Sequence, residues 1–269
     1  MLPEDVPACI EVTVRAPWAT DDAETRAWQD QRLRHLLATD PGGSWVAEDE
    51  QGIAGLAQAL RREDVWGLSL LLVVERCRGT GAGRGLLEAT LAHGAGARRG
   101  VIASSTHPAA MALYAGAGFA LRPAVALFGP VRRAPAIPPV VEIDAPWEPW
   151  MHELARDQRG GGYEPDVALW AAAGTRVCSV EHRGFTLGRA GRLVSLLAAD
   201  EDAARALLEA HLALVPPGDN AILDFVTAGQ DWAVTTGLRA GLPLSPDGPL
   251  FVRGPVRADR PWIPSGALL

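Results

Sequence analysis

The stretch that decides the fold is LSLLLVVERCRGTGAGRG, Leu68–Gly85. An apolar run, Leu68–Val74, comes before the glycine-rich run Arg78–Gly85, and a helical pattern follows. Four glycines at alternate positions let the main chain approach a ligand without interference from Cβ atoms. The helix behind them offers unpaired N–H groups and positive dipole density to an anion. The stretch therefore predicts a strand, a loop that binds a phosphorylated ligand, and a helix.

One common phosphate-binding loop is excluded, and a second is disfavoured, because their partner residues are missing. A nucleoside triphosphatase loop needs Lys after its last glycine, and all 25 basic residues of this chain are Arg. The dinucleotide pattern Gly-x-Gly-x-x-Gly ends on Arg84 when counted from Gly79 and on Leu86 when counted from Gly81. No acidic residue closes the next expected strand, VIASST, residues 101–106. The dinucleotide interpretation is therefore weak.

The remaining pattern is a basic residue that opens the loop, Arg78-x-x-Gly81-x-Gly83, with a second motif after it. The strand VIASST is followed by HPAAMALYAGAGF, residues 107–119, a helix that carries a Tyr and ends in Gly-Phe. In this order and spacing, the two motifs resemble the acetyl-CoA signature of the GCN5-related N-acetyltransferase superfamily. A glycine-rich turn alone would be a weaker signal than the two motifs together.

The resemblance implies acetyl-CoA as co-substrate and direct attack of an amine on its thioester. The pantetheine arm would pair with the end of the strand, and an N–H near Val73 would stabilise the oxyanion. Loop N–H groups would hold the pyrophosphate, with charge added by Arg78 and Arg84, although either Arg is equally well a solvated surface group. The residues implied in cofactor binding are Leu72, Val73, Val74, Arg78, Gly79, Thr80, Gly81, Ala82, Gly83, Arg84, His107, Ala110 and Tyr114.

Tyr114 matches the family's helix tyrosine and is the candidate catalytic residue, since a phenol near the CoA sulfur can protonate the departing thiolate. The alternative is an aromatic ring that only packs the helix against the sheet. His107 stands where the family commonly carries Asn. A His could donate the same hydrogen bond, but a structural or solvent-facing His is the simpler interpretation.

A general base is not identified by the sequence. The expected pocket strand, WGLSLLLVV, carries only Ser69 as a polar residue. We therefore expect a relay through water, or an acid from elsewhere such as Glu63 or Asp64.

The chain is predicted to be α/β (α+β): two tandem acyl-CoA N-acyltransferase folds, each a mixed sheet flanked by helices. We expect a catalytic domain at 1–131, a proline-rich linker at 132–142 and a degenerate second domain at 143–269 that shapes the acceptor pocket. The second half repeats the order of strands and helices. Its glycine loop is replaced by Ala199–Asp202, whose three carboxylates would cap the helix and exclude a diphosphate. A purely structural role for this half is equally well supported.

The expected elements follow from hydrophobic periodicity. The first half is predicted to hold an opening strand at 11–16 and helices within 21–37. The pocket strand follows, with a helix from about Gly83 to Arg98 after the loop. Further strands are expected at 44–49, 52–63 and 119–131, and in the second half at 192–198 and 221–227, with helices at 201–212 and 231–240.

Composition excludes several classes of partner. The formal charge of −7 argues against a nucleic-acid module, and no apolar stretch approaches the length of a membrane span. Three cysteines without paired spacing favour reduced thiols and a cytoplasmic protein, and the scattered histidines predict no metal site.

The acceptor is expected to be a primary amine of a small molecule or peptide, and the protein a monomer or homodimer. Acidic and aromatic residues of the second half weakly favour a cationic amine, although acidic residues on a surface usually only increase solubility. These acidic and aromatic residues are Tyr163, Glu164, Asp224, Asp231 and Trp232. Two alternatives stay open: a mycothiol-synthase-like tandem acetyltransferase, and a CoA-binding sensor without turnover.

Overall fold

The computed structural model describes residues 1–16, 19–255, 257 and 260–269. The chain forms two compact units, Met1–Ala97 and Arg98–Leu269. Among the described residues, every helix is too short or too polar to span a membrane.

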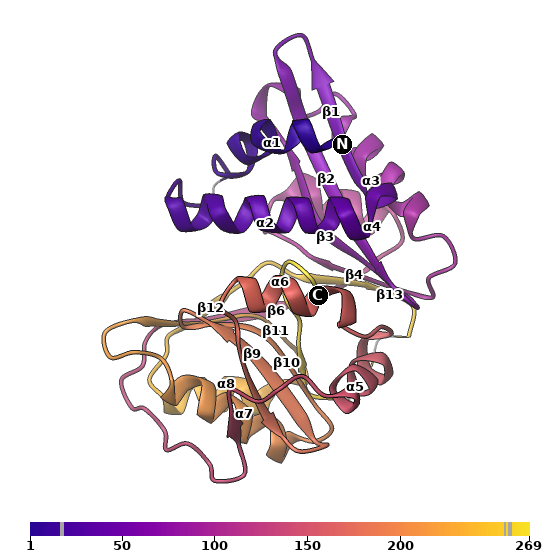
Figure 1. The fold of residues 1–269 in the computed structure, drawn as a ribbon. Helices are drawn as coiled ribbons and strands as arrows, with labels where there is room; N and C mark the ends of the chain where they lie inside the picture. The colour runs from indigo at the N-terminus through magenta and orange to yellow at the C-terminus, as the bar shows by residue number, and fades with distance from the viewer. Residues whose placement is uncertain (17–18, 256, 258–259) are drawn as a thin grey trace. The chain divides into compact units, whose positions relative to one another are not determined.

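The first unit contains an antiparallel meander of three strands with helices on both faces (Figure 1). Leu56 of the middle strand packs against Val6 and Leu33 of the first two helices. Its neighbour Gly55 lies against Leu86 of the third helix. Since successive strand residues point to opposite faces, the helices cover both faces of the meander. The elements are η1 (Pro3–Asp5), α1 (Val6–Thr13), α2 (Ala23–Thr39), η2 (Pro41–Gly43), β1 (Ser44–Asp49), β2 (Gly52–Arg62), β3 (Val65–Val73), η3 (Glu75–Cys77) and α3 (Ala82–His93).

The prediction of a strand at 11–16 is wrong, because the chain forms helix α1 up to Thr13. Val6, Cys9 and Thr13 are its buried residues, at the spacing of one helical face. The alternating apolar residues that suggested a strand extend beyond the end of this helix. Helix α3 ends at His93, before the predicted limit, where Gly94 lies against the ring of Trp66.

The second unit contains strands of two sheets, with most of its helices against the larger one (Figure 1). The larger sheet has the order β12-β6-β11-β10-β9-β8-β7, and β14 pairs with β10. The elements are β4 (Arg99–Ala103), α4 (Pro108–Gly116), β5 (Ala120–Arg122), β6 (Ala124–Pro130), β7 (Glu142–Ile143), α5 (Pro149–Arg159), η4 (Glu164–Asp166), α6 (Val167–Ala172), β8 (Arg176–Val180), β9 (Gly184–Arg189), β10 (Arg192–Ala198), α7 (Glu201–Ala213), β11 (Asn220–Thr227), α8 (Asp231–Arg239), β12 (Leu244–Pro246), β13 (Leu250–Arg253) and β14 (Trp262–Ile263).

Two strands, β6 and β13, pair with strands that are distant from them in the sequence. β13, close to the C-terminal end, lies between β4 and β5. β6 follows β5 after the single residue Pro123, yet it lies between β11 and β12. One residue is too short a connection for a tight hairpin, so β6 cannot fold back against β5. The segment predicted as one strand at 119–131 is therefore two strands in different sheets.

The predicted fold class, tandem mixed α/β folds with helices against the sheets, is confirmed. Residues 132–141 contain no helix or strand, as expected of a linker. The domain boundary at 132–142 stays a prediction, because the compact units divide between Ala97 and Arg98.

Candidate functional site

The glycine-rich loop joins β3 to α3 in the first unit. Gly79 and Gly81 have φ angles of 81° and 95°, in the left-handed region that favours glycine. A Cβ atom at Gly79, Gly81 or Gly85 would meet no other atom within 4 Å. The turn of the chain therefore requires glycine at Gly79 and Gly81, and the space beside all three residues is open.

The main chain of the loop carries unused donors. No described residue accepts a hydrogen bond from the N–H groups of Gly79 to Arg84. The N–H of Arg78 is used, because it donates to the carbonyl of Glu75 at 3.1 Å, and that of Gly85 donates to Gly81 at 3.0 Å. Since Ala82 begins α3, its first turn adds the positive end of the helix dipole. The segment Gly79–Arg84 is suited to hold an anion.

Two arginine side chains flank these donors. Arg78 and Arg84 are exposed, and no described carboxylate pairs with either guanidinium. The Thr80 hydroxyl donates to the carbonyl of Cys77 at 2.8 Å, which closes the loop on itself. The loop therefore offers positive charge and main-chain donors with no acid of its own.

A carboxylate from β1 fixes the start of the loop. Asp49 accepts two hydrogen bonds from Arg76 and one from the thiol of Cys77. The hydrogen bonds from Arg76 and Cys77 lower the pKa of Asp49 well below its usual range. The hydrogen bond between Cys77 and Asp49 also raises the pKa of the Cys77 thiol. The sequence does not predict this contact, since no local pattern links residues 27 positions apart.

The end of β3 presents main-chain groups away from β2. The N–H of Val74 donates to the carbonyl of Ala54 at 2.9 Å, and Val73 lies opposite Gly55. The main-chain N–H groups of successive residues in an antiparallel strand point alternately to one side and to the other. Those of Leu72 and Val74 therefore point towards β2, whereas that of Val73 points away from it. Of the three predicted strand residues, Val73 is therefore the one whose N–H does not face β2.

A bulge interrupts the same strand. Gln58 lies opposite Leu70 and Ala59 opposite Leu68, which leaves Ser69 as the extra residue. The Ser69 hydroxyl is buried, and none of the described residues forms a hydrogen bond with it.

Glu63 and Asp64 form the turn between β2 and β3, at the end of β3 opposite the loop. The strand of nine residues separates them from the loop by about 30 Å at roughly 3.3 Å per residue. This distance disfavours either residue as the base for a thioester at the end of β3, and the identity of the general base stays a prediction.

Tyr114, His107 and Ala110 belong to the second unit. Tyr114 lies on α4, 5% exposed, with its ring edge-on to Phe251 of β13 at 5.5 Å. Burial raises its pKa to about 12, and no described residue hydrogen-bonds its hydroxyl. His107 is the exposed residue before α4, and Ala110 is half-buried in its first turn. The loop belongs to the other unit, so the assembly of these residues into one site stays a prediction.

The counterpart of the loop in the second half is capped by protein. Asp200 accepts a hydrogen bond from the N–H of Ala203 at 3.0 Å at the start of α7. Arg183 pairs with both oxygens of Asp200, at 3.0 and 2.7 Å. The expected carboxylate cap is therefore present at this helix.

The second-half residues that weakly favoured a cationic amine are largely occupied. Tyr163 and Trp232 are buried in the core, at 0% and 1% exposure. Glu164 pairs with Arg156, and Asp224 pairs with Arg192. Tyr163 and Trp232 therefore expose almost no surface to an amine, and a cationic acceptor stays a prediction.

Comparisons with known proteins agree with the fold. Residues 13–119 match the model of the acetyltransferase (GNAT) family. No curated protein sequence matches the chain. A putative acetyltransferase from Pyrococcus horikoshii has a TM-score of 0.81 at 14% identity, over 100% of this chain and 94% of that one.

Two further solved structures are similar over most of both chains. A GCN5-related N-acetyltransferase from Sphaerobacter thermophilus has a TM-score of 0.59 at 16% identity, over 96% of each chain. A tandem GNAT protein from the clavulanic acid biosynthesis pathway has a TM-score of 0.56 at 15% identity, over 94% of this chain and 96% of that one. At such identities the likeness extends to the fold and no further.

Proposed function

Because residues 13–119 match the model of the acetyltransferase (GNAT) family, we propose that the chain transfers the acetyl group of acetyl-CoA to a primary amine. The amine belongs to a small molecule or a peptide. The observation that carries this proposal is the run of unused N–H groups from Gly79 to Arg84 at the head of α3. A pyrophosphate accepts several hydrogen bonds and carries the negative charge that this helix end favours.

The loop holds the pyrophosphate in this proposal. The N–H groups of Gly79–Arg84 donate to its oxygens, and the side chains of Arg78 and Arg84 add charge-assisted contacts. The ion pair between Asp49 and Arg76 fixes the start of the loop before the ligand arrives. Less conformational entropy is then lost on binding.

The end of β3 orients the acetyl group. The N–H of Val73, which points away from β2, donates to the thioester carbonyl oxygen. As an amine attacks, negative charge grows on this oxygen, and a fixed donor stabilises the transition state more than the ground state. The attack is direct, so no residue of the chain forms a covalent intermediate.

Tyr114 supplies a hydrogen bond to the leaving sulfur. With a pKa of about 12, its phenol stays protonated at neutral pH. A simple thiol has a pKa of about 8.5, so complete transfer of the proton to the free thiolate is uphill by roughly 5 kcal/mol. Tyr114 therefore acts first as a donor to the developing thiolate. Its proton is transferred only when solvent, or the ammonium formed as the amine attacks, returns a proton to the phenol.

The acceptor amine loses its proton to water in this proposal. The nearest carboxylates of the β2–β3 turn lie at the far end of β3, and the hydroxyl of Ser69 is the only polar side chain among Leu68–Val73. An amine whose pKa is depressed on binding needs no base. Residues 143–269 contribute to acceptor binding and hold no second CoA, because Asp200 occupies the helix end that a pyrophosphate would use.

A CoA-binding sensor without turnover is the second candidate, favoured by the lack of a carboxylate along β3. One experiment separates the two functions. The purified protein is incubated with acetyl-CoA and a panel of amines, including a mycothiol precursor amine, while free thiol is followed. Release of CoA that depends on an amine supports the transferase. Tight binding of acetyl-CoA without turnover across the panel contradicts it and supports the sensor.

A further inference from the structure

Arg32 of α2 is a buried cation with only a neutral partner. Its side chain is 4% exposed, and its Nη2 donates to Oε1 of Gln29 at 2.8 Å. Among the described residues, no carboxylate pairs with this guanidinium. Burial lowers the pKa of Arg32 to about 10, and no acid contributes in the opposite direction. The group is therefore charged at pH 7, and its charge is not compensated by the described part of the chain.

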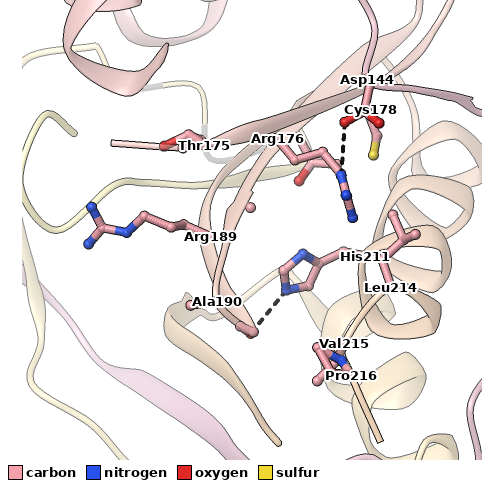
Figure 2. Close-up of a pocket in the computed structure, with 14 residues that line it drawn as sticks. Asp144, Thr175, Arg176, Cys178, Arg189, Ala190, His211, Leu214, Val215 and Pro216 are labelled. Carbon is pink, nitrogen blue, oxygen red and sulfur yellow. Dashed lines mark hydrogen bonds and ion pairs between the residues drawn. The ribbon is translucent and has the colours of Figure 1, made fainter. Parts of the chain in front are cut away.

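Two other arginines show how the chain compensates such a charge. Arg62 of β2 is also 4% exposed, and Asp40 pairs with it at 2.7 Å. A cavity of about 440 Å³ beside β8, β9 and the end of α7 contains Arg176, which pairs with Asp144 at 2.9 Å (Figure 2). A charge removed from water without a counter-charge is strongly unfavourable. Arg32 lacks the anion that the other two arginines have.

One nitrogen of the Arg32 guanidinium remains open to solvent. Nη2 is bonded to Gln29, and Nε is buried without a partner. Nη1 forms no hydrogen bond with a described residue, and it is not among the buried atoms that lack a partner, so it contacts solvent. An anion can therefore reach Nη1 and accept a charge-assisted hydrogen bond from it.

Arg32 belongs to the same compact unit as the strand proposed to orient the acetyl group. The next residue, Leu33, shares a buried cluster with Leu70 of β3. The carbonyl of Leu33 accepts from Nε2 of Gln58 at 3.0 Å, and Gln58 lies opposite Leu70. Leu70 precedes Val73 by three residues, which is about 10 Å along a strand. Helix α2 therefore crosses β3 close to the proposed thioester donor.

We propose that Arg32 binds the carboxylate of an acceptor that carries both a primary amine and a carboxylate, as an amino acid does. A carboxylate oxygen accepts from Nη1, and its negative charge compensates the buried guanidinium. The acceptor class is then narrower than primary amines in general. This inference rests on the proposed acetyl transfer, because it assigns the carboxylate to the acceptor of that reaction.

The first test uses the full chain and a panel of α- and ω-amino acids, each paired with its carboxamide, which lacks the negative charge. Release of free thiol from acetyl-CoA measures turnover, and calorimetry measures binding. For the amino acids that react, we expect kcat/KM at least about tenfold above that of the amide, and a loss of this difference in Arg32→Met. Turnover of acids and amides at equal rates would overturn this inference while acetyl transfer stands. Arg32-dependent binding of acids without turnover would instead retain Arg32 as a carboxylate site and contradict the transferase.

The second test measures unfolding temperature and needs no turnover. Arg32→Met replaces an uncompensated buried cation with an apolar side chain, so the unfolding temperature is expected to stay the same or rise. The matched control is Arg62→Met, which removes an equally buried arginine from Asp40 and is expected to lower it. Amino acids that bind should raise the unfolding temperature of the wild type and leave that of Arg32→Met unchanged. A fall in Arg32→Met as large as in Arg62→Met, or neither binding nor turnover of any amino acid in the panel, would overturn the proposal.

Discussion

Asp49 and Arg76 form a bidentate ion pair, with Nε to Oδ2 at 2.9 Å and Nη2 to Oδ1 at 3.0 Å. Asp49 is the last residue of β1, and Arg76 lies two residues before Arg78, where the loop begins. Asp49 also accepts from the N–H of Gln51 and the thiol of Cys77. One carboxylate thus connects the β1–β2 turn to the start of the glycine loop.

Asp49→Ala is expected to weaken acetyl-CoA binding about three- to tenfold, because the start of the loop loses its anchor and more entropy is lost on binding. The free energy of unfolding should change little, since the pair is partly exposed. Calorimetric titration and denaturant unfolding measure the two quantities. The control, Asp30→Ala, removes a comparable exposed pair with Arg34 on α2. Equal affinity in both variants would show that the pair does not position the loop.

Gly81→Asp is expected to abolish acetyl-CoA binding while the fold remains. The residue sits at the head of α3, where a carboxylate would occupy the N–H groups and repel a pyrophosphate. Gly218→Asp is the matched control, because Gly218 has a φ of 93° and equally open surroundings in the second unit. Both variants carry similar backbone strain. A calorimetric affinity for Gly81→Asp close to that of the control would remove the loop from the proposed site.

Tyr114→Phe is expected to lower kcat by about 10²- to 10⁴-fold with little change in the affinity for acetyl-CoA, since only the phenol is lost. Tyr163→Phe serves as the control. Tyr163 is the only other tyrosine of the chain, and its hydroxyl donates to the main-chain oxygen of Leu269. This control should lose stability without a comparable loss of turnover. If the kcat of Tyr114→Phe equals that of the wild type, the tyrosine ring has only a packing role against Phe251.

Asp40 forms a buried ion pair in the first unit. Its Oδ2 lies 2.7 Å from Arg62, and its Oδ1 accepts from His93 and from the N–H of Arg61. Burial raises the pKa of Asp40, but the charge and hydrogen bond of Arg62 outweigh this effect, so its pKa lies below the usual value. Asp40→Asn is expected to cost about 3–5 kcal/mol at pH 7, because the buried Arg62 loses its ion pair with the carboxylate.

The pH dependence of this cost has a definite sign. A carboxylate whose pKa is depressed in the folded state stabilises the fold at pH values above its pKa in the unfolded chain, about 3.9. This stabilisation is lost as the pH falls through the pKa of the folded state. Denaturant unfolding at a series of pH values should therefore show the gap between wild type and Asp40→Asn narrowing below about pH 4. A gap that stays constant down to the acid transition would contradict the assignment.

Local sequence signals predicted the loop and its helices well. Pro108 begins α4 as expected, and Gly118, with a φ of 84°, ends its final turn before the buried Phe119. The alternating glycines placed the turn between β3 and α3 correctly. Such features depend on propensities and turn chemistry within a few residues, which a sequence displays directly.

Long-range pairing was not predictable in the same way. Nothing local indicates that β13 would lie beside β4, or that β6 would pair with β11. Pro123 is the one clue, because it leaves no room for a hairpin. The contact of Asp49 with Arg76 likewise depends on packing between distant segments.

The account depends most on the loop between β3 and α3. The most direct test is a crystal structure of the protein soaked with coenzyme A. We predict pyrophosphate oxygens within about 2.7–3.2 Å of main-chain nitrogens in the segment Gly79–Arg84. A loop that stays empty in a crystal with coenzyme A bound elsewhere, or one filled by a side chain of the protein, would contradict the account.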